Sequence, residues 1–234
     1  MAISNPTVLN TTGNQTNANT VVGGSVSPTA NALVWVCVGV CRGLAGSSNP
    51  VTGISAAFSI TGAWDWVEVG AAGTGGRVSA TVIGWAIAAA SPGSGAVTVT
   101  FTNNQARRSI TTGEVVSGFD TTTPVIQEKV NSGVDTTLTI TFDGTPATGS
   151  LILAAVNSQE DTAITPDTDY TELQEQASGG TEQSFLEVQY KNGSADTTVA
   201  WSDLNTVANT GAAIEIAEAA APGTGNPWYV YAQQ

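Results

Sequence analysis

The chain has 234 residues, of which 41% are hydrophobic and only 11% are charged, and its formal net charge at pH 7 is −13. A chain of this length can bury one large core or two smaller ones, so its stability requires neither a structural metal nor a disulfide. The scarcity of lysine and arginine excludes a basic phosphate-binding surface, and we expect no nucleic-acid partner. Because Thr, Ser, Asn and Gly stand in place of the good helix formers, we expect strands and glycine turns with almost no helix.

The N-terminal region and the apolar runs bear on where the protein is made. Residues 1–10 contain no basic residue and no apolar core, so we expect no secretory signal peptide. The longest apolar run, residues 80–90, is shorter than the roughly 20 residues that span a bilayer. These features predict a protein that is made in a host cytoplasm and does not insert into a membrane.

Both cysteines lie on what is predicted to be one strand. Cys37 and Cys41 are four residues apart. At about 3.3 Å per residue, this spacing separates them too far for a disulfide. We therefore expect two thiols.

Four tryptophans lie in the first half of the chain, namely Trp35, Trp64, Trp66 and Trp85. Trp64 and Trp66 occupy one face of a predicted strand, next to a long connection at residues 41–62. A surface tryptophan at this place suits either a contact between subunits or stacking on a glycan. We favour the subunit contact and predict Trp64 and Trp66 as part of an assembly interface.

An internal repeat organises the chain. With an offset of about 118 residues, Pro6, Pro28 and Leu33 align with Pro124, Pro146 and Leu151. After a longer loop in the first copy, the alignment continues in the same order with four further pairs: Trp66 with Tyr170, Glu68 with Glu172, Trp85 with Tyr190, and Glu114 with Glu215. We therefore divide the chain into a first repeat at 1–120, a second repeat at 121–218, and a tail at 219–234.

The second repeat predicts seven strands. They lie near residues 124–130, 136–142, 150–157, 168–174, 184–191, 197–202 and 211–218. In one of them Leu186, Val188 and Tyr190 alternate with Glu187, Gln189 and Lys191, which predicts one buried face and one wet face. About seven strands in about 100 residues is typical of an immunoglobulin-like or jelly-roll sandwich. The fold prediction is two tandem β-sandwich repeats, and a single sandwich shared by both copies remains open.

The two repeats differ in charge. The first 120 residues carry four acidic and four basic side chains, whereas residues 121–234 carry two lysines against fifteen acidic side chains. One interpretation is that an acidic face aids solubility. The other is that a partner covers the neutral, Trp-rich repeat while the acidic repeat faces solvent.

The C-terminal tail differs in composition from everything before it. Residues 219–226 are a Pro, Gly and Ala linker, and Trp228, Tyr229 and Tyr231 then follow within four residues. The segment either folds back on its own sandwich as an edge strand or docks on a neighbouring subunit with the aromatics as anchors. We include the three aromatics in the predicted assembly interface.

The composition removes most catalytic chemistry. The chain has no histidine, which excludes Ser-His-Asp and Cys-His triads and an HExxH zinc site. A glycosidase needs only two carboxylates, but the best-placed acids, such as Glu114 and Glu215, recur at matching positions of the two repeats. Recurrence at both positions indicates a role in the fold. We predict no catalytic residue and no enzyme activity.

One acidic loop offers oxygen ligands. Asp161, Asp167 and Asp169 lie within residues 159–170 and are weak candidate ligands for Ca²⁺. The loop lacks the spacing and the glycine of an EF-hand, and a solvated turn is the alternative. No cofactor is predicted otherwise.

Three segments carry packing motifs: residues 149–156 (Gly-Ser-Leu-Ile-Leu-Ala-Ala-Val), residues 169–173 (Asp-Tyr-Thr-Glu-Leu) and residues 116–124 (Val-Ser-Gly-Phe-Asp-Thr-Thr-Thr-Pro). They resemble a loosely related family of duplicated β-sandwich proteins found in bacteriophage particles and on bacterial surfaces. Phe119 stands where the connector of that family often has valine, and Tyr170 where tryptophan is common. The resemblance covers most of residues 5–218, brings no catalytic residue with it, and implies a structural module of a virion or a cell surface.

These observations predict a non-enzymatic structural protein of a virus particle, located in the virion. We expect a phage capsid decoration or tail-associated component that forms a homo-oligomer or a lattice with other virion subunits. The alternative is a receptor- or glycan-binding adhesin module whose partner is a host-surface glycan.

Overall fold

The computed structural model describes residues 2–14, 18–42, 51–72, 78–105, 107–159, 163–179, 184–193 and 196–220. Within these ranges the chain forms strands and turns and no helix, so the all-β prediction is confirmed. All strand pairs are antiparallel.

Among the described residues, each half of the chain contains eight strands, and the first half comprises residues 1–120. Its strands are β1 (Thr7–Asn14), β2 (Ala18–Val26), β3 (Leu33–Arg42), β4 (Val51–Ala56), β5 (Ile60–Ala72), β6 (Val78–Ala88), β7 (Gly95–Gln105) and β8 (Arg107–Val115). They form a five-stranded sheet in the order β1-β8-β3-β6-β5 and a three-stranded sheet in the order β2-β7-β4.

The second half, residues 121–218, contains another eight. They are β9 (Val125–Gly133), β10 (Leu138–Thr141), β11 (Leu151–Gln159), β12 (Thr165–Pro166), β13 (Thr171–Ala177), β14 (Ser184–Asn192), β15 (Thr198–Ser202) and β16 (Asn209–Ile216). Their sheets run β13-β14-β11-β16-β9 and β10-β15-β12. The sequence prediction missed β12, because two residues are too few to show an alternating pattern.

The two halves have the same strand order. Each strand of the first half corresponds to the strand numbered eight higher in the second half, from β1 and β9 to β8 and β16. With this correspondence, both sheets of the first half have the same strand order as the two sheets of the second. The central strands β3 and β11 begin at Leu33 and Leu151, the positions that the repeat aligns. Positions of the two halves that occupy the same place in these sheets are called equivalent below.

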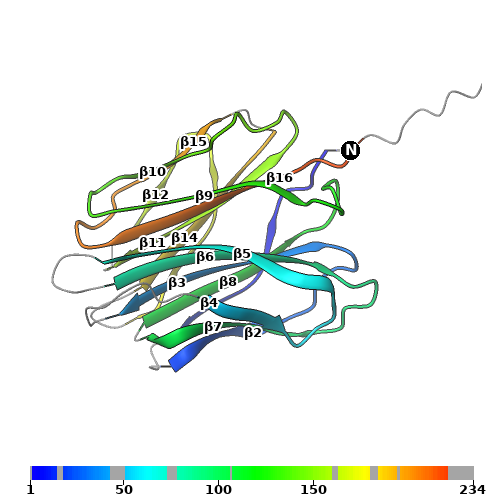
Figure 1. Ribbon diagram of the computed structural model, residues 1–234, viewed down its shortest axis with the longest axis horizontal. Helices are drawn as coiled ribbons and strands as arrows, with labels where there is room; N and C mark the ends of the chain where they lie inside the picture. The colour runs from blue at the N-terminus through cyan, green and yellow to red at the C-terminus, as the bar shows by residue number, and fades with distance from the viewer. Residues whose placement is uncertain are drawn as a thin grey trace, which may run out of the picture.

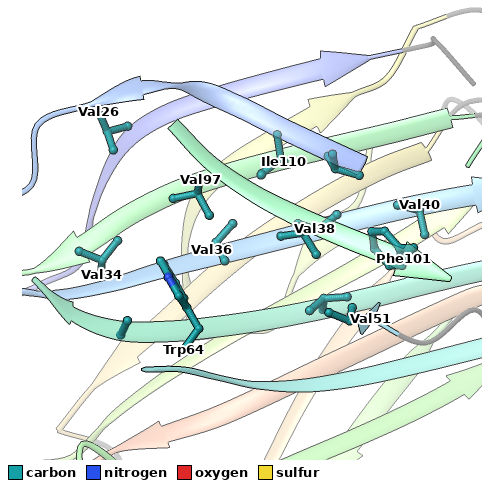
Figure 2. Close-up of a cluster of buried hydrophobic side chains, with 14 of the residues drawn as sticks. Val26, Val34, Val36, Val38, Val40, Val51, Trp64, Val97, Phe101 and Ile110 are labelled. Atoms are coloured by element: carbon teal, nitrogen blue, oxygen red, sulfur yellow. The ribbon is translucent and has the colours of Figure 1, made fainter. Parts of the chain in front are cut away.

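Each half has a sandwich core between its large and its small sheet. In the first half, the core-facing side chains include alternate valines of β3, Trp64 of β5 and Phe101 of β7 (Figure 2). In the second half, the corresponding core holds Tyr170, Phe185 and Trp201. Two sheets that pack face to face over such a core are the pattern expected of a β-sandwich.

A third apolar layer joins the two halves. The two five-stranded sheets pack face to face through Leu33, Trp35, Leu151, Leu186 and Ile214, among other buried side chains. The molecule is therefore a stack of four sheets, with the three-stranded sheets outermost (Figure 1). Each half contributes one five-stranded sheet and one three-stranded sheet to this stack.

This stacking corrects one prediction. Glu187 and Gln189 of β14 were expected on a wet face, but both are fully buried. Leu186 and Val188 face the other half, so the opposite side of β14 lies inside its own sandwich. A strand in the middle of a four-layer stack has no solvent face, and its polar side chains need partners within the protein.

The layer between the halves becomes polar toward the far ends of β3 and β11. This polar seam consists of Ser79, Ser109, Asn157, Ser184 and Thr210, all buried. The hydroxyls of Ser79 and Thr210 lie 2.9 Å apart, and the Ser109 hydroxyl donates to the Ser184 carbonyl at 3.0 Å. The first contact joins β6 to β16 and the second joins β8 to β14. Because β6 is equivalent to β14 and β8 to β16, exchanging the two halves turns one contact into the other. The halves are thus related by an approximate two-fold axis.

Candidate functional site

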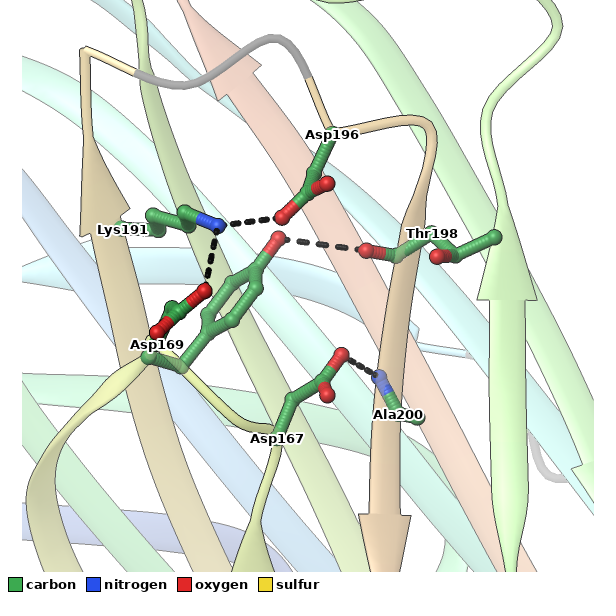
Figure 3. A network of polar contacts seen from close by, with 7 residues as sticks. Asp167, Asp169, Lys191, Asp196, Thr198 and Ala200 are labelled. Carbon is green, nitrogen blue, oxygen red and sulfur yellow. Dashed lines mark hydrogen bonds and ion pairs between the residues drawn. The ribbon is translucent and has the colours of Figure 1, made fainter.

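The acidic loop of the second half surrounds a lysine. The Lys191 ammonium contacts the Asp196 carboxylate, lies 3.9 Å from Asp169 Oδ2, and sits 5.5 Å from the centre of the Tyr170 ring (Figure 3). On the other side of the ring, Asp167 Oδ2 accepts a hydrogen bond of 2.9 Å from the backbone N–H of Ala200. The loop therefore has a cation of its own.

This arrangement bears on the candidate calcium ligands. Asp167 is engaged with a backbone donor and Asp169 faces Lys191, while Asp161 lies outside the described residues. In the part of the chain that the structure covers, no group of three or more acidic or Cys side chains is placed to hold a metal ion. Calcium binding through Asp169 would compete with Lys191 for that carboxylate.

Two glutamates hold equivalent loops. The buried Glu114 accepts hydrogen bonds from the backbone N–H and the hydroxyl of Thr29, at 2.7 and 2.9 Å. The buried Glu215 accepts from the backbone N–H of Ala147 at 2.7 Å and from Gln127 Nε2 at 2.6 Å. Thr29 and Ala147 each follow a proline that the repeat aligns. Both carboxylates therefore secure the connection that leads into the central strand of their half.

A second pair of glutamates corrects the sequence alignment. Glu68 accepts from the backbone N–H of Val51 at 2.7 Å, and Glu175 accepts from that of Ile164 at 2.6 Å. The strand pairing relates Glu68 to β3 through β6, and Glu175 to β11 through β14. The two positions reached in this way on the central strands β3 and β11 are equivalent. The equivalent of Glu68 is thus Glu175 and not Glu172, because a bulge in β13 shifts the register. Burial raises the pKa of both carboxyl groups.

Glu187 is a fully buried acid with one partner for two oxygens. Its Oε2 accepts a hydrogen bond of 2.5 Å from Trp201 Nε1, and Oε1 has no hydrogen-bond partner among the described residues. Burial raises the pKa of Glu187 well above the ordinary value, and the nearby Glu172 and Glu175 raise it further. The site therefore favours the protonated form of Glu187 more strongly than water does.

The predicted interface tryptophans separate. Trp64 is buried in the core of the first sandwich, whereas Trp66 is 36% exposed. Trp64 is thus the counterpart of the buried Tyr170, to which the alignment had matched Trp66. Trp35 and Trp85 belong to the apolar layer between the halves. Of the four, Trp66 is the one with substantial surface for a partner.

The aromatic tail residues Trp228, Tyr229 and Tyr231 lie outside the described residues, but the base of the tail is placed. Glu218 pairs with Phe119 across a single β-bridge, and the Ala219 N–H donates to the Gly118 carbonyl at 2.8 Å. The N-terminal segment lies beside this junction, where the Ser4 N–H donates to the Ser117 carbonyl at 3.0 Å. Figure 1 shows the N-terminus close to the end of β16.

Two surface pockets are possible ligand sites. One, of about 380 Å³, lies against the outer three-stranded sheet of the second half and is lined mainly by hydroxyls, with Pro166 and Asp167. The other, of about 240 Å³, lies between β5, β6 and the connector at 121–124, with Trp85 and Asp65 in its wall. Each contains a single titratable side chain, and acid–base hydrolysis of a glycoside needs two.

Within the ranges the structure covers, no helix is long and apolar enough to cross a membrane. Comparison of the chain with protein-family models, curated proteins and solved structures finds no match.

Sequence reasoning missed two features that position polar groups. The role of Lys191 as the internal cation of the acidic loop needed the fold, because its partners come from two separate segments, residues 169–170 and Asp196. The polar seam needed the fold as well, although one signal was present: equivalent positions 39 and 157 are glycine and asparagine inside otherwise apolar strands. A paired glycine and polar residue in two buried strands indicates a close approach there.

Proposed function

We propose that this chain is a non-enzymatic structural protein of a bacteriophage particle, a capsid decoration or tail-associated surface component that acts through contacts with other subunits. The observation that carries the proposal is the use of four buried or half-buried carboxylates. Glu68, Glu114, Glu175 and Glu215 all accept backbone N–H groups that hold connections and strand starts. The acids that a hydrolase would need are thus engaged in the fold, and equivalent ones serve both halves.

The surface supports the same proposal. The large exposed apolar side chains lie mostly at edge strands and connections, namely Val22, Trp66, Val116, Ile126, Val130 and Val134. A block of four stacked sheets with apolar groups on its edges suits association with neighbouring subunits, since edge strands and apolar patches are common interaction sites. The resemblance of residues 116–124, 149–156 and 169–173 to particle proteins points in the same direction.

The test uses the full chain and its aromatic tail. A variant with Trp228→Ala, Tyr229→Ala and Tyr231→Ala is compared with the wild type by light scattering and by binding to purified particles that lack the protein. A control variant carries Thr224→Ala and Asn226→Ala in the linker. We expect the aromatic variant, and not the control, to lose assembly and particle binding without a change in melting temperature. Assembly and binding equal to those of the wild type would overturn the proposed role of the tail.

The second candidate is a receptor- or glycan-binding module. The observation that favours it is the 380 Å³ pocket of the second half, where Thr137, Thr139, Thr165 and Ser202 present hydroxyls beside Pro166. Hydroxyl donors and acceptors next to an apolar ring are suited to a sugar. Saturable binding of a host glycan that is lost in Thr139→Val would favour this function over assembly.

A further inference from the structure

The stack of the two five-stranded sheets has two side rims. At one rim β1 of the first half lies beside β13 of the second, and at the other β5 lies beside β9. The approximate two-fold axis relates these rims, because β1 is equivalent to β9 and β5 is equivalent to β13. Differences between them therefore mark features that the fold alone does not require.

The β1–β13 rim is closed by polar contacts and close backbone approach. The Thr11 hydroxyl donates to Gln176 Oε1 at 2.9 Å, and a Cβ on Gly13 would lie 2.2 Å from the Ala177 carbonyl oxygen. On the same strand, Asn10 Oδ1 accepts the Gly24 N–H at 2.8 Å. These contacts tie β1 both to β13 and to its own half.

The β5–β9 rim is different. The polar side chains of β9 are turned toward its own half: Gln127 to Glu215, Lys129 to Asp143, and Asn131 to the Thr139 carbonyl. No hydrogen bond between described residues joins β5 to β9. Instead, Ile126 is 47% exposed, Val130 40% and, just past the strand, Val134 43%. An edge strand with apolar side chains and a free edge is a template for strand addition.

The C-terminal tail has the chemistry that would cover this edge. It continues from Glu218, the last charged side chain of a chain with a net charge of −13. Residues 219–226 form a linker, and the segment 227–231 is Pro-Trp-Tyr-Val-Tyr, rich in residues that favour strands. An uncharged aromatic strand can approach an acidic protein without repulsion and bury Ile126 and Val130.

The geometry points to a second copy as the source of the tail. The tail leaves beside the start of β9, where the Ala217 N–H donates to the Pro124 carbonyl at 2.9 Å. A direct continuation along its own β9 would run parallel to that strand, and antiparallel pairing would require the tail to travel along β9 and then reverse its direction. A tail from another molecule needs no such reversal, and antiparallel pairing is the mode of every ladder in this fold.

We propose that the free edge of β9, with Ile126 and Val130, is the docking site for the aromatic segment 227–231 of a second copy of this chain. The proposal rests on the proposed function and names the surface through which it operates. The pairing adds a sixth strand to the sheet β13-β14-β11-β16-β9, and the aromatic side chains cover the exposed apolar residues at the β5–β9 rim.

Three full-chain variants test it. The edge variant is Val130→Asp, the tail variant is Trp228→Ala with Tyr229→Ala and Tyr231→Ala, and the matched control is Val22→Asp, a valine of similar exposure (44%) on the outer sheet. Self-association is measured by light scattering and sedimentation over a concentration series. We expect the edge and tail variants each to associate at least tenfold more weakly than the wild type, and the control to be unchanged.

Mixing the variants identifies the source of the tail. The edge variant retains an intact tail and the tail variant an intact edge, so an equimolar mixture should form one-to-one complexes that neither forms alone. If the tail variant is monomeric while Val130→Asp associates like the wild type, the proposed function survives and the β9 site is wrong. If the wild type is monomeric and both variants melt at a lower temperature, the tail docks on its own chain and the second copy is wrong. A monomeric wild type with unchanged melts in both variants overturns the docking site and the assembly role together.

Discussion

Gly39 and Asn157 occupy equivalent positions of the two central strands and face each other across the layer between the halves. A Cβ on Gly39 would lie 2.4 Å from Asn157 Oδ1. Asn157 Nδ2 donates to the Val40 carbonyl at 3.1 Å and to the Ser79 hydroxyl at 2.7 Å, and Asn157 Oδ1 accepts from the Ser184 hydroxyl at 2.6 Å. One half thus supplies the space and the other the polar group, so the approximate symmetry is broken at this point.

Gly39→Ala should lower the free energy of unfolding by about 1–3 kcal/mol, the usual cost of overpacking a buried site. Asn157→Ala should be destabilising too, because buried partners lose their hydrogen bonds. In the double variant the new methyl group at 39 occupies space that the amide vacated, so its cost should be clearly less than the sum. Urea unfolding of the four proteins measures this coupling. Gly53→Ala, where a Cβ would meet nothing within 4 Å, is the control; strict additivity would contradict the contact.

Glu215→Gln should destabilise the protein more than Glu114→Gln. An amide in place of the Glu215 carboxylate turns a donor toward either Ala147 or Gln127, and Gln127 cannot invert because its Oε1 accepts the Gly144 N–H at 3.1 Å. We expect a loss of about 1–3 kcal/mol. At Glu114, the Thr29 hydroxyl can rotate and accept from the new amide. Chemical unfolding, with the exposed Glu128→Gln as control, tests the order; equal losses at the two sites would contradict it.

Glu187 should make the protein less stable as the pH rises. Its pKa is raised in the folded state by burial, so the folded protein binds the proton more tightly than the unfolded chain. The contribution to stability is complete below the unfolded pKa and is lost as the pH rises toward the folded pKa, with a slope of up to about 1.4 kcal/mol per pH unit. Glu68 and Glu175, which are also raised, act in the same direction.

Glu187→Gln isolates this contribution, because the amide oxygen still accepts the Trp201 N–H. We expect the variant to be more stable than the wild type at pH 8 and its stability to depend less on pH between about 5 and 8. Urea unfolding across this range is the measurement. A variant with the same pH dependence as the wild type would show that Glu187 does not titrate there.

Lys191→Gln should create a dependence on cations that the wild type lacks. The ammonium lies beside Asp196 and Asp169, and without it these carboxylates repel each other. The pair is partly exposed, so we expect a loss of less than about 1 kcal/mol. The melting temperature of the variant should recover on addition of calcium, while that of the wild type should respond to neither calcium nor a chelator. A wild-type melt that falls on chelation would establish a metal site in this loop.

The alternating patterns of the sequence determined the strands, and the recurring prolines and glutamates indicated which positions of the two halves are equivalent. The two thiols at Cys37 and Cys41 also followed from strand geometry alone, and the structure has no disulfide between them. These features depend on the local path of the backbone and on residues close in sequence, which is why a single chain reveals them.

Only the tertiary structure decided which faces are covered. The pattern around Glu187 is that of a strand with one wet face, yet the stacking of two large sheets buries both faces. A bulge in β13 made Glu175 the equivalent of Glu68, and packing distinguished the buried Trp64 from the exposed Trp66. Burial in a layered stack depends on contacts between segments more than 100 residues apart, and alternation along one strand holds no information about what lies across from it.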